Sequence, residues 1–262
     1  MKTRLDAELV RRGLARSREA ATDLIAAGNV LVSGMPASKA ATQVDAETSI
    51  TLKDDHAEFV SRGGHKLAGA LDKFTQIDVS GKTALDAGAS TGGFTDVLLK
   101  RGAKKVGAVD VGYGQLAWEL QKDERVKILD RVNVRNLTAA QVGEEIDLVV
   151  ADLSFISLKL VLPALISVAK EGADFLVMVK PQFEVGKEKL GAGGVVRDVH
   201  LRKEAVVAVA DSAFALTLGT LGVVASPLPG PSGNVEYFLW LRKGAPALLE
   251  VDLDLAIEKG PA

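Results

Sequence analysis

Two lysines and two acidic residues are placed so that one lysine could act as a base. The other three residues could hold it in place. Asp152 and Lys180 each end an apolar segment of strand length, and Glu236 begins another. A hydroxyl group needs a base to take its proton, and a lysine can do this if burial and a second cation keep its amine neutral. We therefore predict Lys180 as the base and Lys66 as the neighbouring cation. Asp152 and Glu236 would orient the lysines and hold the substrate, although each residue taken singly is more often part of a structural salt bridge.

A glycine-rich segment, DAGASTGG (86–93), joins a strand pattern to a helix pattern. Glycines at such a place let a ligand approach the backbone and expose amide groups at the start of a helix. Ser90 breaks the Gly-x-Gly-x-x-Gly spacing of dinucleotide sites, and an acid lies two positions before the first glycine. The pattern favours S-adenosylmethionine over NAD as a cofactor, and the alternative is a tight turn that binds no ligand.

A second carboxylate, Asp110, supports a nucleoside site at this segment. It ends the next strand pattern, 22 positions after Gly88, where a carboxylate can accept both ribose hydroxyls of a bound nucleoside. The predicted cofactor residues are Asp86, Gly88, Ala89, Ser90, Thr91, Gly92, Gly93, Asp110 and Val111.

The chain from residue 82 on alternates strand and helix patterns, which predicts a parallel sheet covered on both faces. The final strand, 235–241, follows a turn at 227–233 that is too short for a helical crossover, so we expect this strand to run antiparallel to its neighbour. Its start then lies at the edge where the other strands end, and ligands of such sheets bind at that edge. The predicted strands cover residues 83–87, 106–109, 126–129, 146–151, 175–179, 222–225 and 235–241, and the predicted helices 93–101, 115–120, 158–170 and 201–218. Six parallel strands and one reversed strand indicate an α/β fold of the class I (Rossmann-like) methyltransferases.

Residues 4–52 form a separate small α+β unit by their pattern, with helices at 4–10 and 18–27, strands at 30–32 and 50–52 and a turn at 34–36. Between residues 2 and 39 this unit carries seven basic residues against four acidic ones, while the whole chain has a formal net charge of −2. Local positive charge is expected of a surface that binds nucleic acid phosphates, and the alternative is an ordinary solvated helix face. The predicted RNA contacts are Arg4, Arg11, Arg12, Arg16, Arg18 and Lys39, with Arg62, Lys187 and Lys189 farther along the chain.

The first fifty residues or so resemble the S4 domain, an RNA-binding module, through the runs RLDAELVRRGLARSREAA (4–21) and IAAGNVLVSG (25–34). Lys66, Asp152, Lys180 and Glu236 resemble the Lys-Asp-Lys-Glu tetrad of the FtsJ-type ribose 2′-O-methyltransferases. Together with SRGGHK, DAGASTGGF, ADLSFIS, VKPQFE and GNVEYF, these features resemble the TlyA family over residues 4–242. The resemblance implies methylation of cytidine riboses, with ribosomal RNA and ribosomal subunits as partners. Some members of that family were named haemolysins.

These patterns predict three parts of the chain. An S4-like RNA-binding domain is expected over residues 1–57, a polar and glycine-rich linker over 58–65, and an FtsJ-like methyltransferase domain over 66–262. The tail after Arg242 matches no pattern.

Composition excludes several kinds of site. There is no cysteine, and the three histidines are scattered, so we expect no disulfide and no metal. Acids near the N-terminus argue against a secretory signal, and glycines interrupt the apolar stretch 206–225, which favours a buried helix and strand over a membrane segment. We expect a cytoplasmic protein. A pore-forming haemolysin and a non-catalytic RNA-binding protein remain alternatives, and the oligomeric state and target nucleotide stay open.

The segment 182–198, which follows the predicted base, combines four glycines with Lys187, Lys189 and Arg197. Glycines lower the cost of opening, and the basic residues offer contacts to a phosphate backbone. We predict a mobile lid that closes over an extruded nucleotide. The alternative is an ordinary long loop packed by Phe183 and Val185.

Overall fold

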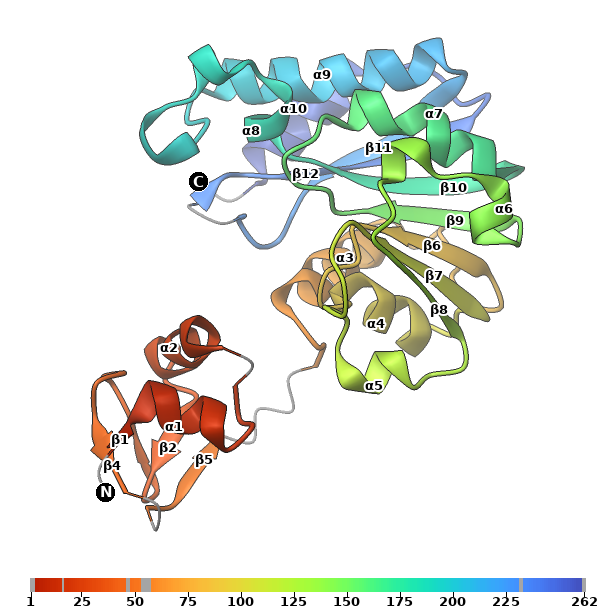
Figure 1. The fold of residues 1–262 in the computed structure, drawn as a ribbon. Coiled ribbons are helices and arrows are strands. Elements are labelled where there is room, and N and C mark those ends of the chain that lie inside the picture. The colour runs from red at the N-terminus through yellow and green to blue at the C-terminus, as the bar shows by residue number, and fades with distance from the viewer. Residues whose placement is uncertain (1–2, 16, 46–47, 53–57, 231–232, 261–262) are drawn as a thin grey trace. The chain divides into compact units, whose positions relative to one another are not determined.

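The computed structural model describes residues 3–15, 17–45, 48–52, 58–230 and 233–260. The chain folds as two compact units, Met1–Glu58 and Phe59–Ala262, drawn as ribbons in Figure 1. The structure differs from the linker expected over 58–65, because helix α3 (Arg62–Lys73) begins inside it and Phe59 is buried in the core of the larger unit. Gly64 packs closely against the Phe59 ring and has no room for a side chain. Lys66 therefore lies in the second turn of α3.

The smaller unit packs two helices on short strands around its own apolar core. Leu5, Leu9, Ile25 and Val30 are buried there. Its elements are β1 (Thr3–Arg4), α1 (Leu5–Arg11), α2 (Arg18–Ala26), β2 (Val30–Val32), β3 (Met35–Pro36), β4 (Gln43–Val44) and β5 (Ile50–Leu52). β2 is the middle strand between β3 and β5, and β1 pairs with β4. The turn expected at 34–36 is displaced, since Met35 and Pro36 pair with β2 as a strand and Ser33 and Gly34 make the turn with positive φ.

The larger unit contains a seven-stranded sheet, which confirms the predicted fold class. β12 is antiparallel to both of its neighbours, and the registers of the remaining pairs are parallel. The strands follow one another across the sheet as β11 (Leu218–Ala225), β12 (Tyr237–Lys243), β10 (Ala169–Val179), β9 (Ile146–Ala151), β6 (Thr83–Ala87), β7 (Lys105–Asp110) and β8 (Val126–Asp130). The start of β12 therefore lies beside the carboxyl end of β10, with Tyr237 opposite Val179.

Helices cover the two faces of this sheet (Figure 1). One apolar cluster joins α7 (Leu158–Val168), α9 (Val199–Ala215) and α10 (Glu250–Glu258) to one face, and a second joins α3 and α4 (Gly93–Lys100) to the other. Helix α10 follows Arg242, where the sequence showed no pattern, and it packs on β11 through Leu253 and Ala256. The short helices are α5 (Trp118–Gln121), η1 (Val134–Asn136), α6 (Ala139–Val142), α8 (Pro181–Glu184), η2 (Lys187–Lys189) and η3 (Ala192–Gly194).

The apolar stretch 206–225 divides between α9 and β11, and its buried apolar residues in the core cluster are Val206, Val209, Ala210, Ala213, Leu218 and Val223. Among the described residues, no helix has both the length and the apolar character needed to cross a membrane.

Candidate active site

The glycine loop between β6 and α4 is shaped by the strands beside it. Gly88 has φ +89°, and a side-chain carbon there would lie 2.5 Å from the backbone oxygen of Asp152. Gly92, with φ +95°, is enclosed by Leu116 and Leu120. Any larger residue would push the loop away from β9 or from α5, so the glycines keep the carboxyl ends of β6 and β9 close together.

A pocket of about 520 Å³ lies against this loop. Four of the predicted cofactor residues line it, namely Gly88, Ser90, Asp110 and Val111. The other five are not among its lining residues; Asp86, Ala89, Gly92 and Gly93 are buried, and Thr91 is half-buried. Sequence reasoning missed Gln115, Asn133, Leu153, Ser154, Phe155 and Ile156, which also line the pocket. Asn133 comes shortly after the carboxyl end of β8, so the rule that identified Asp110 could have found it.

The Asp110 carboxylate, which lines this pocket, is held in position by two backbone amides. The backbone amide of Ser90 donates to its Oδ2 at 2.8 Å, and that of Gly112 donates to its Oδ1 at 2.7 Å. Each carboxylate oxygen has a further lone pair, so the side chain can still accept two hydrogen bonds from a ligand.

Asp86 is a buried acid under the loop, with no exposed surface. Burial raises its pKa to about 7, and the hydroxyl of Thr95, which donates to Oδ2 at 2.7 Å, offsets only part of that effect. The neighbouring charges of Asp152 and Asp110 raise the pKa further. Its Oδ1 has no hydrogen-bond partner among the described residues. Asp86 therefore links β6 to α4 through Thr95, and its raised pKa brings its titration close to neutral pH.

Replacing Asp86 with asparagine should change how stability depends on pH. A carboxyl group whose pKa is higher in the folded state holds its proton more tightly there, so the wild type loses stability as pH rises from its ordinary pKa of 3.8 toward about 7. We expect the stability of Asp86→Asn relative to wild type to increase by about 1.4 kcal/mol per pH unit over this interval. Urea unfolding at several pH values measures this. The same change at exposed Asp211 is the control, and a constant difference between wild type and Asp86→Asn would contradict the assignment.

The four predicted catalytic residues come together as two lysine–carboxylate pairs. Lys180 Nζ lies 2.5 Å from Asp152 Oδ1 and 3.0 Å from the hydroxyl of Ser154. Lys66 Nζ donates to Glu236 Oε2 at 2.6 Å, and this pair is almost fully buried, with exposed side-chain fractions of 9% and 0%. Each lysine thus has a carboxylate as its partner; one pair joins α3 to the start of β12, and the other joins the ends of β9 and β10.

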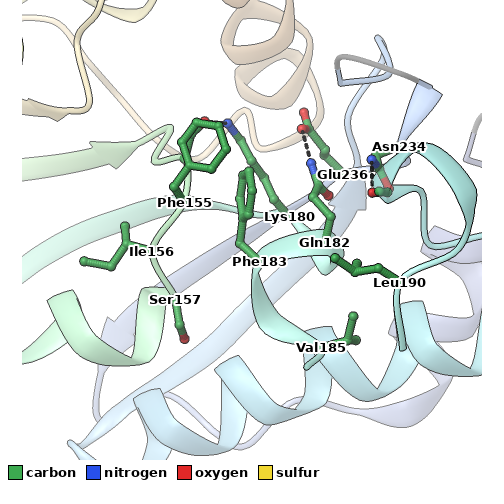
Figure 2. Close-up of a pocket in the computed structure, with 13 residues that line it drawn as sticks. Phe155, Ile156, Ser157, Lys180, Gln182, Phe183, Val185, Leu190, Asn234 and Glu236 are labelled. Carbon is green, nitrogen blue, oxygen red and sulfur yellow. Dashed lines mark hydrogen bonds between the residues drawn. The ribbon is translucent and has the colours of Figure 1, made fainter. Parts of the chain in front are cut away.

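A second pocket, of about 690 Å³, adjoins these pairs (Figure 2). It shares Ser154, Phe155 and Ile156 with the cofactor pocket, so the two pockets meet at that segment. Phe155 is 91% exposed, adopts a positive φ of 62° and lies 5.1 Å from the ring of Phe183. Strained backbone at a non-glycine residue is typical of functional sites.

The segment 182–198, predicted as a lid, is anchored at both ends. Glu184 accepts hydrogen bonds from Ser157 Oγ at 2.6 Å and from the Leu158 amide at 2.7 Å. Asn234 accepts from the Val196 amide at 3.0 Å and donates to the Gly194 carbonyl at 3.1 Å. The motion of the residues between these anchors stays a prediction.

The predicted RNA-contact residues differ in how they are held. Buried Asp6 pairs with Arg4 and Arg18, and buried Glu8 pairs with Arg11 and Arg12. Hydrogen bonds from Arg11 and Arg12 lower the pKa of Glu8 to about 2. Two acids therefore arrange four arginines on the smaller unit.

The remaining predicted RNA contacts are more scattered. Lys39 and Arg62 are exposed, and Lys189 pairs with Glu204 at 2.9 Å. Arg16 and the side chain of Lys187 lie outside the described residues.

The sheet order, the glycine loop and the polar edge together define a methyltransferase of the FtsJ-like class. The FtsJ-like methyltransferase family model matches residues 59–243, and the S4 domain model matches residues 3–50. The chain belongs to the TlyA family of methyltransferases, which combine these two domains. This assignment favours an enzyme over the pore-forming and non-catalytic alternatives.

Three relatives show how close the similarity is. The chain is 57% identical, over 99% of both sequences, to the Mycobacterium tuberculosis (strain ATCC 25618 / H37Rv) protein named 16S/23S rRNA (cytidine-2′-O)-methyltransferase TlyA. It is 37% identical to Hemolysin A of Brachyspira hyodysenteriae, over 89% of this chain and 97% of that protein. The solved structure of a putative hemolysin from Streptococcus thermophilus superposes with a TM-score of 0.79 at 36% identity, covering 98% of this chain and 95% of that one.

Proposed function

We propose that this chain transfers a methyl group from S-adenosylmethionine to the 2′-hydroxyl of cytidine in ribosomal RNA. The observation that carries the proposal is the placement of Lys180 and Asp152 where the two pockets meet. The name of the Mycobacterium tuberculosis relative supports cytidine as the target nucleoside and ribosomal RNA as the substrate. We expect the reaction to take place in the cytoplasm.

The pocket beside the glycine loop has groups that fit the proposed cofactor. Asp110 would accept hydrogen bonds from both ribose hydroxyls of the adenosine, and Val111 would line the site next to it. Gly88 allows close approach to the backbone at the end of β6. When bound, S-adenosylmethionine supplies an electrophilic methyl group on a sulfonium sulfur.

The residues at the sheet edge would carry out the proton transfer. Lys180 Nζ would take the proton that the 2′-hydroxyl releases as its oxygen accepts the methyl group, which the sulfonium of the bound cofactor would supply with sulfur as the leaving group. Asp152 and Ser154 hold Nζ in place, and the Asp152 charge stabilises the ammonium that forms. The buried Lys66–Glu236 pair would hold the lining of the pocket beside Lys180 in place.

RNA would be bound by both units. The arginines that Asp6 and Glu8 arrange on the smaller unit offer charged contacts to phosphates. A ribose in a structured RNA reaches a pocket only if its nucleotide leaves the stack, and the pocket of about 690 Å³ beside Lys180 offers a place for it.

Labelled S-adenosylmethionine tests this function directly. Incubation of the protein with unmethylated ribosomal subunits, followed by digestion to nucleosides, should yield labelled 2′-O-methylcytidine.

Asp110→Ala should weaken cofactor binding by about 1.5–3 kcal/mol, the range for hydrogen bonds to a charged group, as measured by calorimetry. Label on a base instead of a ribose would refute the proposed reaction, and unchanged affinity in a folded variant would remove Asp110 from the site.

A further inference from the structure

Gln182 is a polar residue of the second pocket that neither the catalytic nor the cofactor assignment uses. It lies in α8, directly after Pro181, and lines the pocket together with Lys180 and Glu236 (Figure 2). Its Nε2 donates to Glu236 Oε1 at 3.5 Å. Its Oε1 is buried and has no hydrogen-bond partner among the described residues. Buried acceptors are rarely left unpaired, so this oxygen indicates a missing partner.

The neighbours of Gln182 determine which way its amide points. A carboxylate accepts hydrogen bonds and donates none, so Glu236 selects the orientation with Nε2 toward itself. Glu236 cannot turn away easily, because Lys66 holds its other oxygen at 2.6 Å. A flipped amide would place two acceptors against each other. In this orientation one N–H of Gln182 Nε2 is used on Glu236, and the amide oxygen can accept a hydrogen bond from a ligand.

The other polar side chains that line this pocket are already engaged. Asn234 uses both its oxygen and its nitrogen on the backbone of the segment 194–196. The hydroxyl of Ser157 donates to Glu184, and that of Ser154 contacts Lys180. Among the described lining residues, the side-chain amide oxygen of Gln182 is thus the buried acceptor that has no hydrogen-bond partner.

We propose that Gln182 reads the target base by accepting a hydrogen bond from the exocyclic amine of cytosine. This inference rests on the proposed function, because it takes the base to enter the pocket beside Lys180. Uracil carries a carbonyl oxygen where cytosine carries its amine, so it would face the Gln182 oxygen with a second acceptor. A buried group left unpaired in this way discriminates strongly between substrates. Gln182 selects cytidine over uridine.

The test compares ribosomal subunits that carry cytidine at the methylated position with subunits that carry uridine there. The position is located first by mapping 2′-O-methylated riboses. The wild type should methylate cytidine at least about tenfold faster, and Gln182→Met should lose about 10- to 100-fold on cytidine with little change on uridine. Affinity for S-adenosylmethionine should stay the same. Gln76→Met, at an exposed position before the sheet, is the matched control.

An equal loss of methylation rate on the cytidine and uridine subunits would overturn the inference, because a residue that only positions Glu236 affects both nucleotides alike. An unchanged rate on the cytidine subunits would overturn it as well. If Gln182→Met does not fold, Gln182→Leu makes the same comparison. If the wild type methylates neither the cytidine subunits nor the uridine subunits, the proposed function is refuted instead.

Discussion

Replacing Lys180 with methionine should reduce the rate of methyl transfer by about 10²- to 10⁴-fold, the usual contribution of a positioned acid or base. Methionine keeps much of the side-chain volume but cannot take the proton of the 2′-hydroxyl. Lys180 is not among the residues that line the cofactor pocket, so affinity for S-adenosylmethionine should change little. Single-turnover transfer to ribosomal subunits and calorimetry measure the two quantities separately.

Two further variants show whether this result is specific to the amine of Lys180. Lys180→Arg keeps the positive charge but is not a proton acceptor at working pH, so it should be nearly as slow as Lys180→Met. Lys170→Met removes an exposed lysine that pairs with Asp147, and it should leave the rate unchanged. A Lys180→Met rate within tenfold of wild type would mean that another group takes the proton.

The single variant Lys66→Met should destabilise the larger unit by about 3–5 kcal/mol, because it leaves the buried Glu236 charge without its partner. The double variant Lys66→Met/Glu236→Gln removes both charges and should recover much of that loss. Urea unfolding followed by tryptophan fluorescence measures the effect. Both tryptophans, Trp118 and Trp240, belong to the larger unit, so the signal reports on that unit.

An exposed ion pair provides the comparison for this result. Lys170→Met breaks the contact with Asp147 at the surface and should cost no more than about 1 kcal/mol. If the single Lys66→Met change and the double variant lose equal stability, the Lys66–Glu236 pair does not balance a buried charge.

Local patterns in the sequence determined the architecture and the edge at which the site lies. Alternating apolar segments predicted the strands, and the shortness of the turn at 227–233 predicted the reversal of β12. Once strand directions were known, the rule that ligands bind at the carboxyl edge brought Asp110, Asp152, Lys180 and Glu236 together. Such inferences succeed because periodicity and turn length act over a few neighbouring residues.

Contacts between distant residues were decided only by the tertiary structure. Lys66 and Glu236 are separated by 170 positions, and their pairing depends on where α3 packs against the sheet. The helical start at Arg62 depends likewise on burial of Phe59, since two glycines in a row predict flexibility by themselves.

The same distinction separates the predicted cofactor residues that line the pocket from those that do not. Asp86 stands in the glycine motif, but the packing of β6 between β7 and β9 buries its carboxyl group under the loop. The orientation of Gln182 follows from Glu236, 54 positions away. A sequence specifies which side chains are available near a strand end, whereas strand order and packing determine which of them face a ligand and which face one another.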